Sequence, residues 1–181
     1  MNKNYLIFDF QSSTPCSTKV IEEMVPYWNE IWGNPSNTNN RSGIFASAAV
    51  EVSRENIASC LNINPKRLIF TSGATEANNL ALLGHARAQA KLTGKPGHII
   101  TVSTEHHAVL DPLRQLQKEG FRLTELQPNK DGLINIDQLE QAFQKDTFLM
   151  SVMAANNEIG VLQPISEIGC FCKSKGIAFH T

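Results

Sequence analysis

The chain has 181 residues, of which 41% are hydrophobic and 18% are charged, and its formal net charge at pH 7 is −1. This length and apolar content are enough for one domain with a hydrophobic core, and the near-zero charge argues against binding to nucleic acid or to an anionic membrane. No apolar run approaches the length of a membrane span, and the N-terminus lacks the apolar stretch of a signal peptide, so a cytoplasmic protein without a membrane segment is expected.

The first part of the chain predicts an arm followed by helices. Its expected segments are an extended arm over residues 1–15, a helix over 18–32, a polar, turn-rich loop over 33–43 and a helix over 44–60. Ser17 is a suitable N-cap for the first of these helices. Pro26 lies inside the same helix and predicts a kink or a restart there, because proline lacks the N–H that a helix interior needs.

From residue 61 onward, strands and helices alternate. The expected strands cover residues 68–70, 98–103, 121–126, 148–153 and 177–181. The expected helices cover residues 75–92, 108–119, 137–145 with Asp137 as the cap, and 165–175 with Gly176 closing the last turn. Such alternation is typical of βαβ units, so we predict a three-layer α/β fold with a mainly parallel sheet and helices on both faces.

Four cysteines are present: Cys16, Cys60, Cys170 and Cys172. Their spacing matches neither a zinc knuckle nor the disulfide framework of a secreted domain. Cys170 and Cys172 lie two residues apart on a predicted helix, where their side chains point to different faces. We therefore expect buried or partly buried free thiols, with no metal-binding or redox role.

One stretch has the features of an anion site. The predicted strand over 68–70 passes through Thr71, Ser72 and Gly73 into a predicted helix. The first N–H groups of a helix have no partner inside it and lie at the positive end of its dipole. Hydroxyl groups add donors, and glycine permits close approach to a ligand. A phosphate cradle and an ordinary capped turn with Thr75 as the N-cap both fit these residues.

Polar side chains also follow two other predicted strands. Thr104-Glu-His106 follows one, and Asn156-Asn157 follows another. Because ligands in such sheets bind beyond the carboxyl ends of the strands, all three polar clusters are expected at one edge. An imidazole can stack on a ring or move a proton, and an amide can donate to a phenolate oxygen. Taken singly, His106 fits a capping role and the asparagines fit a turn. The presence of all three polar clusters at one edge of the sheet favours a site for a phosphorylated aromatic cofactor.

These motifs together resemble a known family. Gly33-Asn-Pro35, Thr71-Ser-Gly-Ala-Thr-Glu76, Thr104-Glu-His106 and Asn156-Asn-Glu-Ile-Gly160 occur in the order seen in the N-terminal half of cysteine desulfurases. These are pyridoxal-phosphate enzymes of the class V aminotransferase type. The resemblance implies part of the family's large domain, with residues 1–60 as an arm and helices and residues 61–181 as an incomplete cofactor-binding domain.

The resemblance also implies roles for individual residues. Ala74 and Thr75 would hold the cofactor phosphate, and His106 would stack on the pyridine ring and assist proton transfer. Asn157 would bond the phenolic oxygen of the ring and approach the substrate carboxylate. The implied reaction takes sulfur from L-cysteine, releases alanine and passes a persulfide to iron–sulfur cluster assembly or another acceptor. Family members are homodimers, so a homodimer is expected.

The sequence departs from the family pattern in places. Asp9-Phe-Gln-Ser-Ser-Thr-Pro15 replaces the usual Asp-x-x-Ala-Thr-Thr-Pro, and Asn40 precedes Arg41 where a histidine is common. In the family, four residues lie beyond the stretch that matches Thr181: the aspartate that pairs with the pyridine nitrogen, the lysine that binds the cofactor covalently, the persulfide-forming cysteine and the carboxylate-binding arginine. We therefore expect no covalent attachment at the family position in this chain, and no activity without a complementing C-terminal half.

The family's sheet has the strand order 3-2-4-5-6-7-1. The five predicted strands correspond to strands 1 to 5, so a 3-2-4-5 core is expected, with the strand over 68–70 lacking its neighbour and the strand over 177–181 at an open edge. Two alternatives stay open. One is another class V pyridoxal-phosphate lyase or aminotransferase, and the other is a non-catalytic remnant that binds an intact homologue through its arm and first helices.

Overall fold

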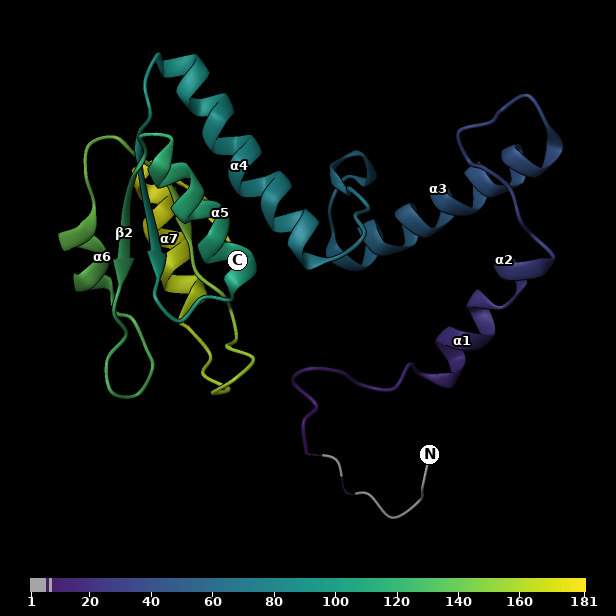
Figure 1. Cartoon of the computed structure of the whole chain (residues 1–181), viewed down its shortest axis with the longest axis horizontal. Helices are drawn as coiled ribbons and strands as arrows, with labels where there is room; N and C mark the ends of the chain where they lie inside the picture. Colours follow the sequence, from purple (N-terminus) through teal and green to yellow (C-terminus); the bar gives the residue numbers. More distant parts are fainter. Residues whose placement is uncertain (1–5, 7) are drawn as a thin grey trace. The chain divides into compact units, whose positions relative to one another are not determined.

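The computed structural model describes residue 6 and residues 8–181, and it divides into two compact units, Met1–Phe70 and Thr71–Thr181 (Figure 1). The N-terminal unit contains α1 (Thr18–Met24), α2 (Pro26–Asn29), α3 (Arg41–Leu61) and a short 3₁₀ helix, η1 (Pro65–Arg67). Among its described residues only Gly43, Ala46 and Ala58 are buried, so this unit has almost no core of its own.

The predicted restart at Pro26 is confirmed, because α1 ends at Met24 and α2 begins at the proline. At the first position of a helix the missing N–H of proline costs nothing. Ser17 stands at the N-cap of α1 as predicted, but its side chain makes no capping hydrogen bond. Helix α3 is closed at both ends by asparagine: the Asn40 side chain accepts from a backbone N–H, and Asn62 ends the helix in the left-handed region.

The predicted strand over residues 68–70 is wrong. Leu68 has extended dihedral angles (φ −88°, ψ 126°), but this segment belongs to no sheet in the described chain. Its polar contact comes instead from α3, where Arg54 Nη1 donates to the Leu68 carbonyl oxygen at 2.6 Å and the guanidinium lies 4.8 Å from the centre of the Phe70 ring. The β-prone residues were recognisable, but a strand also needs a neighbouring strand to satisfy its backbone groups.

Within the described residues, the C-terminal unit holds a four-stranded sheet in the order β2-β1-β3-β4. The strands are β1 (His98–Val102), β2 (Arg122–Leu126), β3 (Thr147–Ser151) and β4 (Ala178–His180). All three pairings are parallel. This is the 3-2-4-5 order that the resemblance implied, and the predicted α/β fold with a mainly parallel sheet is confirmed.

Four helices in the C-terminal unit accompany the sheet: α4 (Ala74–Thr93), α5 (His107–Lys118), α6 (Ile136–Ala142) and α7 (Ile165–Lys175). Adjacent residues of a strand point to opposite faces, and here Ile99 enters the cluster with α4 and α5 whereas Ile100 enters the cluster with α6 and α7. Both faces of the sheet are therefore covered, which gives the three predicted layers.

The helix ends test the capping predictions. Gly176 ends α7 in the left-handed region (φ 67°), as predicted. The prediction of Asp137 as a cap is wrong: the N-cap of α6 is Asn135, whose side chain accepts from the Gln138 N–H while the Gln138 side chain accepts from the Asn135 N–H. Such a reciprocal pair satisfies two helix-end donors, which a single aspartate two residues later cannot do.

A buried histidine at the start of β1 links this strand to β2 and β3. His98 is fully buried, with Nδ1 2.7 Å from Thr147 Oγ1 and Nε2 2.8 Å from Thr124 Oγ1. Burial lowers the pKa of His98, the nearby Arg122 guanidinium lowers it further, and the Asp146 carboxylate opposes both. The folded chain therefore favours the neutral imidazole.

This burial predicts that the chain becomes less stable in acid. An unfolded histidine has a pKa of about 6.5, above that of buried His98, so the unfolded state takes up a proton first. The contribution of His98 to the free energy of unfolding is complete above about pH 6.5 and is lost as the pH falls from there toward the folded pKa. Urea unfolding followed by circular dichroism between pH 7.5 and 5.5 measures this loss.

An H98Q variant should show a weaker pH dependence than the parent chain. The control is H107Q, because the His107 side chain is exposed and lies outside the buried network. We expect H107Q to keep the parental dependence. The interpretation is wrong if H98Q and the parent lose stability equally over this pH range.

Candidate functional site

The N-terminus of α4 carries two of the predicted site residues. Helix α4 begins at Ala74 with Gly73 as its N-cap, so the reading of Thr75 as the N-cap is wrong. Among the described residues, no side chain makes a capping hydrogen bond at this end. The N–H groups of Ala74 and Thr75 therefore lie at the positive end of a 20-residue helix without a capping side chain.

The turn before α4 is held by its own side chains. The Ser72 N–H and hydroxyl both donate to Glu76 Oε2 at 2.6 Å, and these bonds hold the pKa of Glu76 below its usual value. The donors of Ser72 are thus used inside the turn. Gly73 is extended, and a Cβ built on it would meet no atom within 4 Å. The space beside the helix start is open, which fits the approach of a phosphate.

His106 is the N-cap of α5. Its Nδ1 accepts from the Ala108 N–H at 3.0 Å, so the capping role that the sequence left open is present. A nitrogen that accepts a hydrogen bond carries no proton, so in the neutral ring the proton lies on Nε2. The side chain is exposed, and capping leaves Nε2 as the atom that can exchange a proton.

A cavity brings Thr75 and His106 together. Its volume is about 440 Å³ and it lies between α4 and α5. The rest of its lining is Asn79, Leu83, His107, Ala108, Asp111, Pro112 and Gln115. The starts of the two helices therefore share one cavity, although the segment before α4 is not the sheet strand that the prediction assumed. Ala74 and Asn157 are not part of this lining.

Asn157 lies on an exposed loop after β3 that folds back on itself through a bridge between Ala155 and Leu162. Its neighbour Asn156 is buried. The Asn156 Oδ1 accepts hydrogen bonds from the N–H groups of Glu158 and Ile159, each at 2.9 Å. The turn chemistry left open for the two asparagines therefore applies to Asn156.

Sequence reasoning missed Glu105. Its side chain is only 7% exposed, and Oε1 accepts from the Met153 N–H. Burial raises the pKa of Glu105, and the bond from Met153 acts in the opposite direction. A carboxylate between a buried strand and a capping histidine was the signal that could have identified it, because buried carboxylates normally need a partner.

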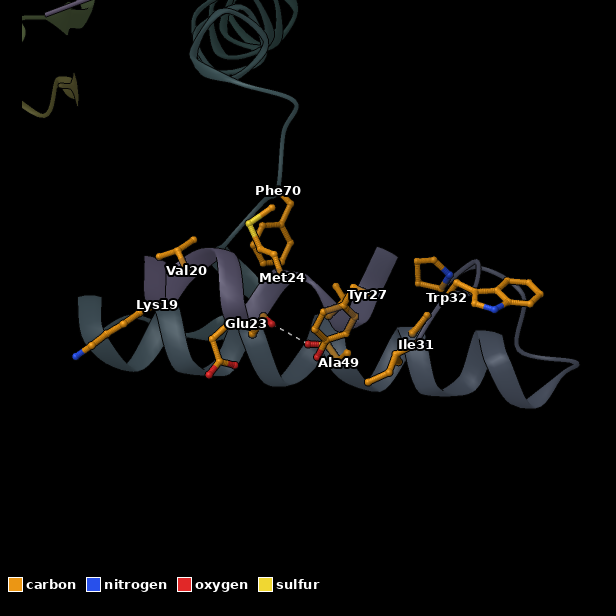
Figure 2. Close-up of a pocket in the computed structure, with 14 residues that line it drawn as sticks. Lys19, Val20, Glu23, Met24, Tyr27, Ile31, Trp32, Ala49 and Phe70 are labelled. Carbon is orange, nitrogen blue, oxygen red and sulfur yellow. Dashed lines mark hydrogen bonds between the residues drawn. The ribbon is translucent and has the colours of Figure 1, made fainter. Parts of the chain in front are cut away.

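A larger cavity lies in the N-terminal unit and contains none of the predicted site residues. Its volume is about 1010 Å³, and α1, α2, α3 and Phe70 line it. Figure 2 shows the labelled side chains, among them Met24, Tyr27, Ile31 and Trp32, gathered along α3. The lining is mostly apolar and lacks a cluster of polar donors. It is suited to hold an apolar surface and is unsuited to hold a phosphate.

All four cysteines are free thiols, as predicted, but the expected burial is wrong for three of them: Cys16, Cys60 and Cys170 are exposed, and Cys172 is buried. Burial raises the pKa of Cys172 to about 11, so this thiol is a poor nucleophile. Among the described residues, no group of three histidine, cysteine, aspartate or glutamate side chains is placed to hold a metal ion. No helix in that same part of the chain combines the length and the apolar character that crossing a bilayer requires.

Sequence comparisons agree with the motifs. The family described as aminotransferase class-V matches residues 6–181. The cysteine desulfurase IscS of Dechloromonas aromatica is 46% identical over 175 residues, which cover 97% of this chain and 43% of that protein. The probable mitochondrial cysteine desulfurase of Schizosaccharomyces pombe is 46% identical over 176 residues, which cover 97% of this chain and 34% of that protein.

Solved structures resemble this chain as well. A NifS-like protein has a TM-score of 0.89 at 35% sequence identity, and the match covers 96% of this chain and 47% of the NifS-like chain. A structure described as SspA in complex with cysteine has a TM-score of 0.88 at 38% identity, covering 96% of this chain and 49% of its own. The chain thus spans less than half the length of each of these relatives.

The capping role of His106 can be tested by substitution. H106A removes the cap of α5 and should lower the free energy of unfolding by about 1 kcal/mol, a typical value for a lost N-cap. H106N should keep most of this stability, because asparagine is a good N-cap. Urea unfolding of both variants is the measurement. Equal losses in H106A and H106N would show that the capping bond contributes nothing.

Proposed function

This chain belongs to the class-V aminotransferase family. From that premise we propose that it functions as part of a cysteine desulfurase and binds the pyridoxal phosphate used to remove sulfur from L-cysteine. Two of the relatives described above are named as cysteine desulfurases, and one solved relative is described as a complex with cysteine. The proposed products are alanine and a persulfide. The observation that carries the proposal is the cavity shared by Thr75 and His106, beside the uncapped start of α4.

The start of α4 suits the phosphate of this cofactor. The N–H groups of Ala74 and Thr75 and the Thr75 hydroxyl supply donors, and the helix dipole favours a negative charge there. The open space beside Gly73 admits a ligand without displacing protein atoms. Two hydrogen bonds from Ser72 to Glu76 shape the turn and leave the phosphate to Ala74 and Thr75.

His106 and Asn157 complete the proposed site. When bound, pyridoxal phosphate supplies an electron sink for chemistry at the carbon atoms of the amino acid. His106 would stack on its ring; with Nδ1 fixed by the Ala108 N–H, the imidazole holds its movable proton on Nε2. Asn157 would donate its amide to the phenolic oxygen and lie near the substrate carboxylate.

The residues present do not cover the whole reaction of the family. In the family, the covalent lysine, the persulfide-forming cysteine and the substrate-binding arginine belong to the part that this chain does not span. We propose that the 181 residues bind the cofactor non-covalently and that sulfur transfer requires that further part. None of the four cysteines present is assigned as the sulfur carrier.

We propose a homodimer, with the arm and helices of residues 1–60 making the contact and residues 61–181 binding the cofactor. The N-terminal unit exposes Tyr27, Trp28 and Trp32 by 51%, 78% and 69%, and its cavity of about 1010 Å³ is mostly apolar (Figure 2). Exposed aromatic clusters of this kind are typical of protein interfaces. The same surface supports the second candidate function, binding to an intact relative.

The proposed compartment is the cytoplasm and the proposed acceptor pathway is iron–sulfur cluster assembly. Four free thiols fit a reducing compartment. Several relatives are named as mitochondrial or mitosomal proteins, so the alternative location is an organelle with a reducing interior. Fractionation of cells that express the protein distinguishes the two; recovery in an organelle fraction would contradict the cytoplasmic proposal.

Cofactor binding tests the proposed function. T75V removes the hydroxyl at the start of α4 and should weaken binding of pyridoxal phosphate by roughly ten- to a hundredfold, since a hydrogen bond to a charged group contributes roughly 1.5–3 kcal/mol. Fluorescence titration of the chain measures the dissociation constant. The matched control is T93V at the other end of the helix, where the hydroxyl donates to the Gln89 and Lys95 carbonyl oxygens. A parent chain that does not bind the cofactor, or a T75V variant that binds as tightly as T93V, would refute the proposal.

Self-association tests the proposed dimer contact. W28S replaces an exposed indole of the N-terminal unit and should shift the chain from dimer toward monomer in light scattering over a dilution series. L92S is the control, because Leu92 is equally exposed (82%) but belongs to the C-terminal unit. A monomeric parent chain, or equal dissociation in both variants, would contradict this contact.

A further inference from the structure

We infer that Glu105 and Asn156 are positioning residues: they clasp the loop after β1 to the loop after β3, and so set the spacing between His106 and Asn157. The inference rests on the proposed function for the roles of His106 and Asn157. The clasp itself is defined by contacts within the chain and can be tested without cofactor.

The clasp consists of reciprocal contacts between two loops. Glu105 Oε1, on the loop after β1, accepts from the Met153 N–H on the loop after β3. In the opposite direction, Asn156 Nδ2 donates to the Thr104 carbonyl oxygen at 2.9 Å. The same Nδ2 lies 3.2 Å from Met153 Sδ. Each loop thus gives one side chain to the backbone of the other.

The clasp begins where the β-ladder stops. The last paired residues of β1 and β3 are Thr101 and Ser151, and the Thr101 hydroxyl donates to the Ser151 carbonyl oxygen at 3.0 Å. Beyond that pair, the segments that follow β1 and β3 are no longer held together by strand pairing. The contacts of Glu105 and Asn156 continue the connection for several residues past the end of the sheet, toward the proposed site.

Burial separates the clasp residues from the site residues. Glu105 and Asn156 are 7% and 8% exposed, whereas their next neighbours His106 and Asn157 are exposed. Each clasp residue therefore directly precedes a proposed site residue in the chain. Fixing the buried member of each pair limits how far the exposed member can move, because one peptide unit joins them.

Asn156 has a second task that only an amide can perform. Its Oδ1 accepts from the Glu158 and Ile159 N–H groups and so shapes the turn around Asn157. Its Nδ2 meanwhile reaches Thr104. An aspartate at this position keeps the acceptors and loses the donor. N156D should therefore preserve the local turn and release the contact between the loops.

Glu105 acts as an acceptor, and a charge is not needed for that. A glutamine at this position still offers a carbonyl oxygen to the Met153 N–H. E105Q should therefore keep the clasp, whereas E105A leaves the Met153 N–H without its acceptor. Rescue by glutamine distinguishes a positioning role from a requirement for the carboxylate as an acid or base.

Hydrogen exchange of the cofactor-free chain tests the clasp directly. In E105A the Met153 amide should exchange about tenfold faster than in the parent, as expected for one lost hydrogen bond, and E105Q should stay near the parental rate. E158Q is the control, because the Glu158 side chain is exposed and takes part through its backbone alone. Parental exchange at Met153 in E105A overturns the clasp, as does an equal acceleration in E105Q.

Cofactor titration then tests whether the clasp positions the site. E105A and N156D should bind pyridoxal phosphate about tenfold more weakly than the parent, with E105Q and E158Q close to it, at unchanged circular dichroism. N156D supplies a second route if E105A fails to fold. Faster exchange with unchanged cofactor affinity in E105A and N156D overturns the positioning role. Absence of binding by the parent refutes the proposed function instead and leaves the exchange result standing.

Discussion

The parallel pairing of β1 with β3 is the constraint on which the candidate site depends. Parallel strands end at the same edge of a sheet, so the loop that carries His106 and the loop that carries Asn157 leave side by side. The hydrophobic clusters on the two faces fix this pairing, because Ile99 and Ile100 enter opposite layers and a one-residue slip would exchange them. The site is therefore a consequence of how the core is packed.

The C-terminal unit divides its polar residues between support and chemistry. Buried groups such as His98 at one edge and Glu105 and Asn156 at the other satisfy their hydrogen bonds within the chain. The residues offered to a ligand, Thr75 and His106, are exposed. A buried polar group without a partner destabilises a fold, whereas an exposed one is solvated until a ligand replaces the water. The N-terminal unit differs, since many of its large apolar side chains are exposed.

The sequence was sufficient to predict the helices, four of the five strands and the strand order, because each is recorded in local periodicity, turn residues or motifs in register. The segment from Leu68 to Phe70 failed as a strand since its β-prone residues carry no information about a neighbour. Thr75 and His106 line one cavity, although the segment before Thr75 is not a strand of the sheet that was expected to bring the two residues together. The contacts of Glu105 could not be predicted, because they join residues 48 positions apart whose meeting depends on the loops beyond the ladder.

The central claim is that the start of α4 and the cap of α5 together form a site for pyridoxal phosphate. The most direct measurement is a ¹⁵N–¹H NMR titration of the 181-residue chain with this cofactor. The predicted result is that the largest amide shifts occur at Ala74 and Thr75 and at the residues around His106, with small shifts at the amino edge near His98. Shifts confined to other parts of the chain, or no saturable shifts at all, would contradict the claim.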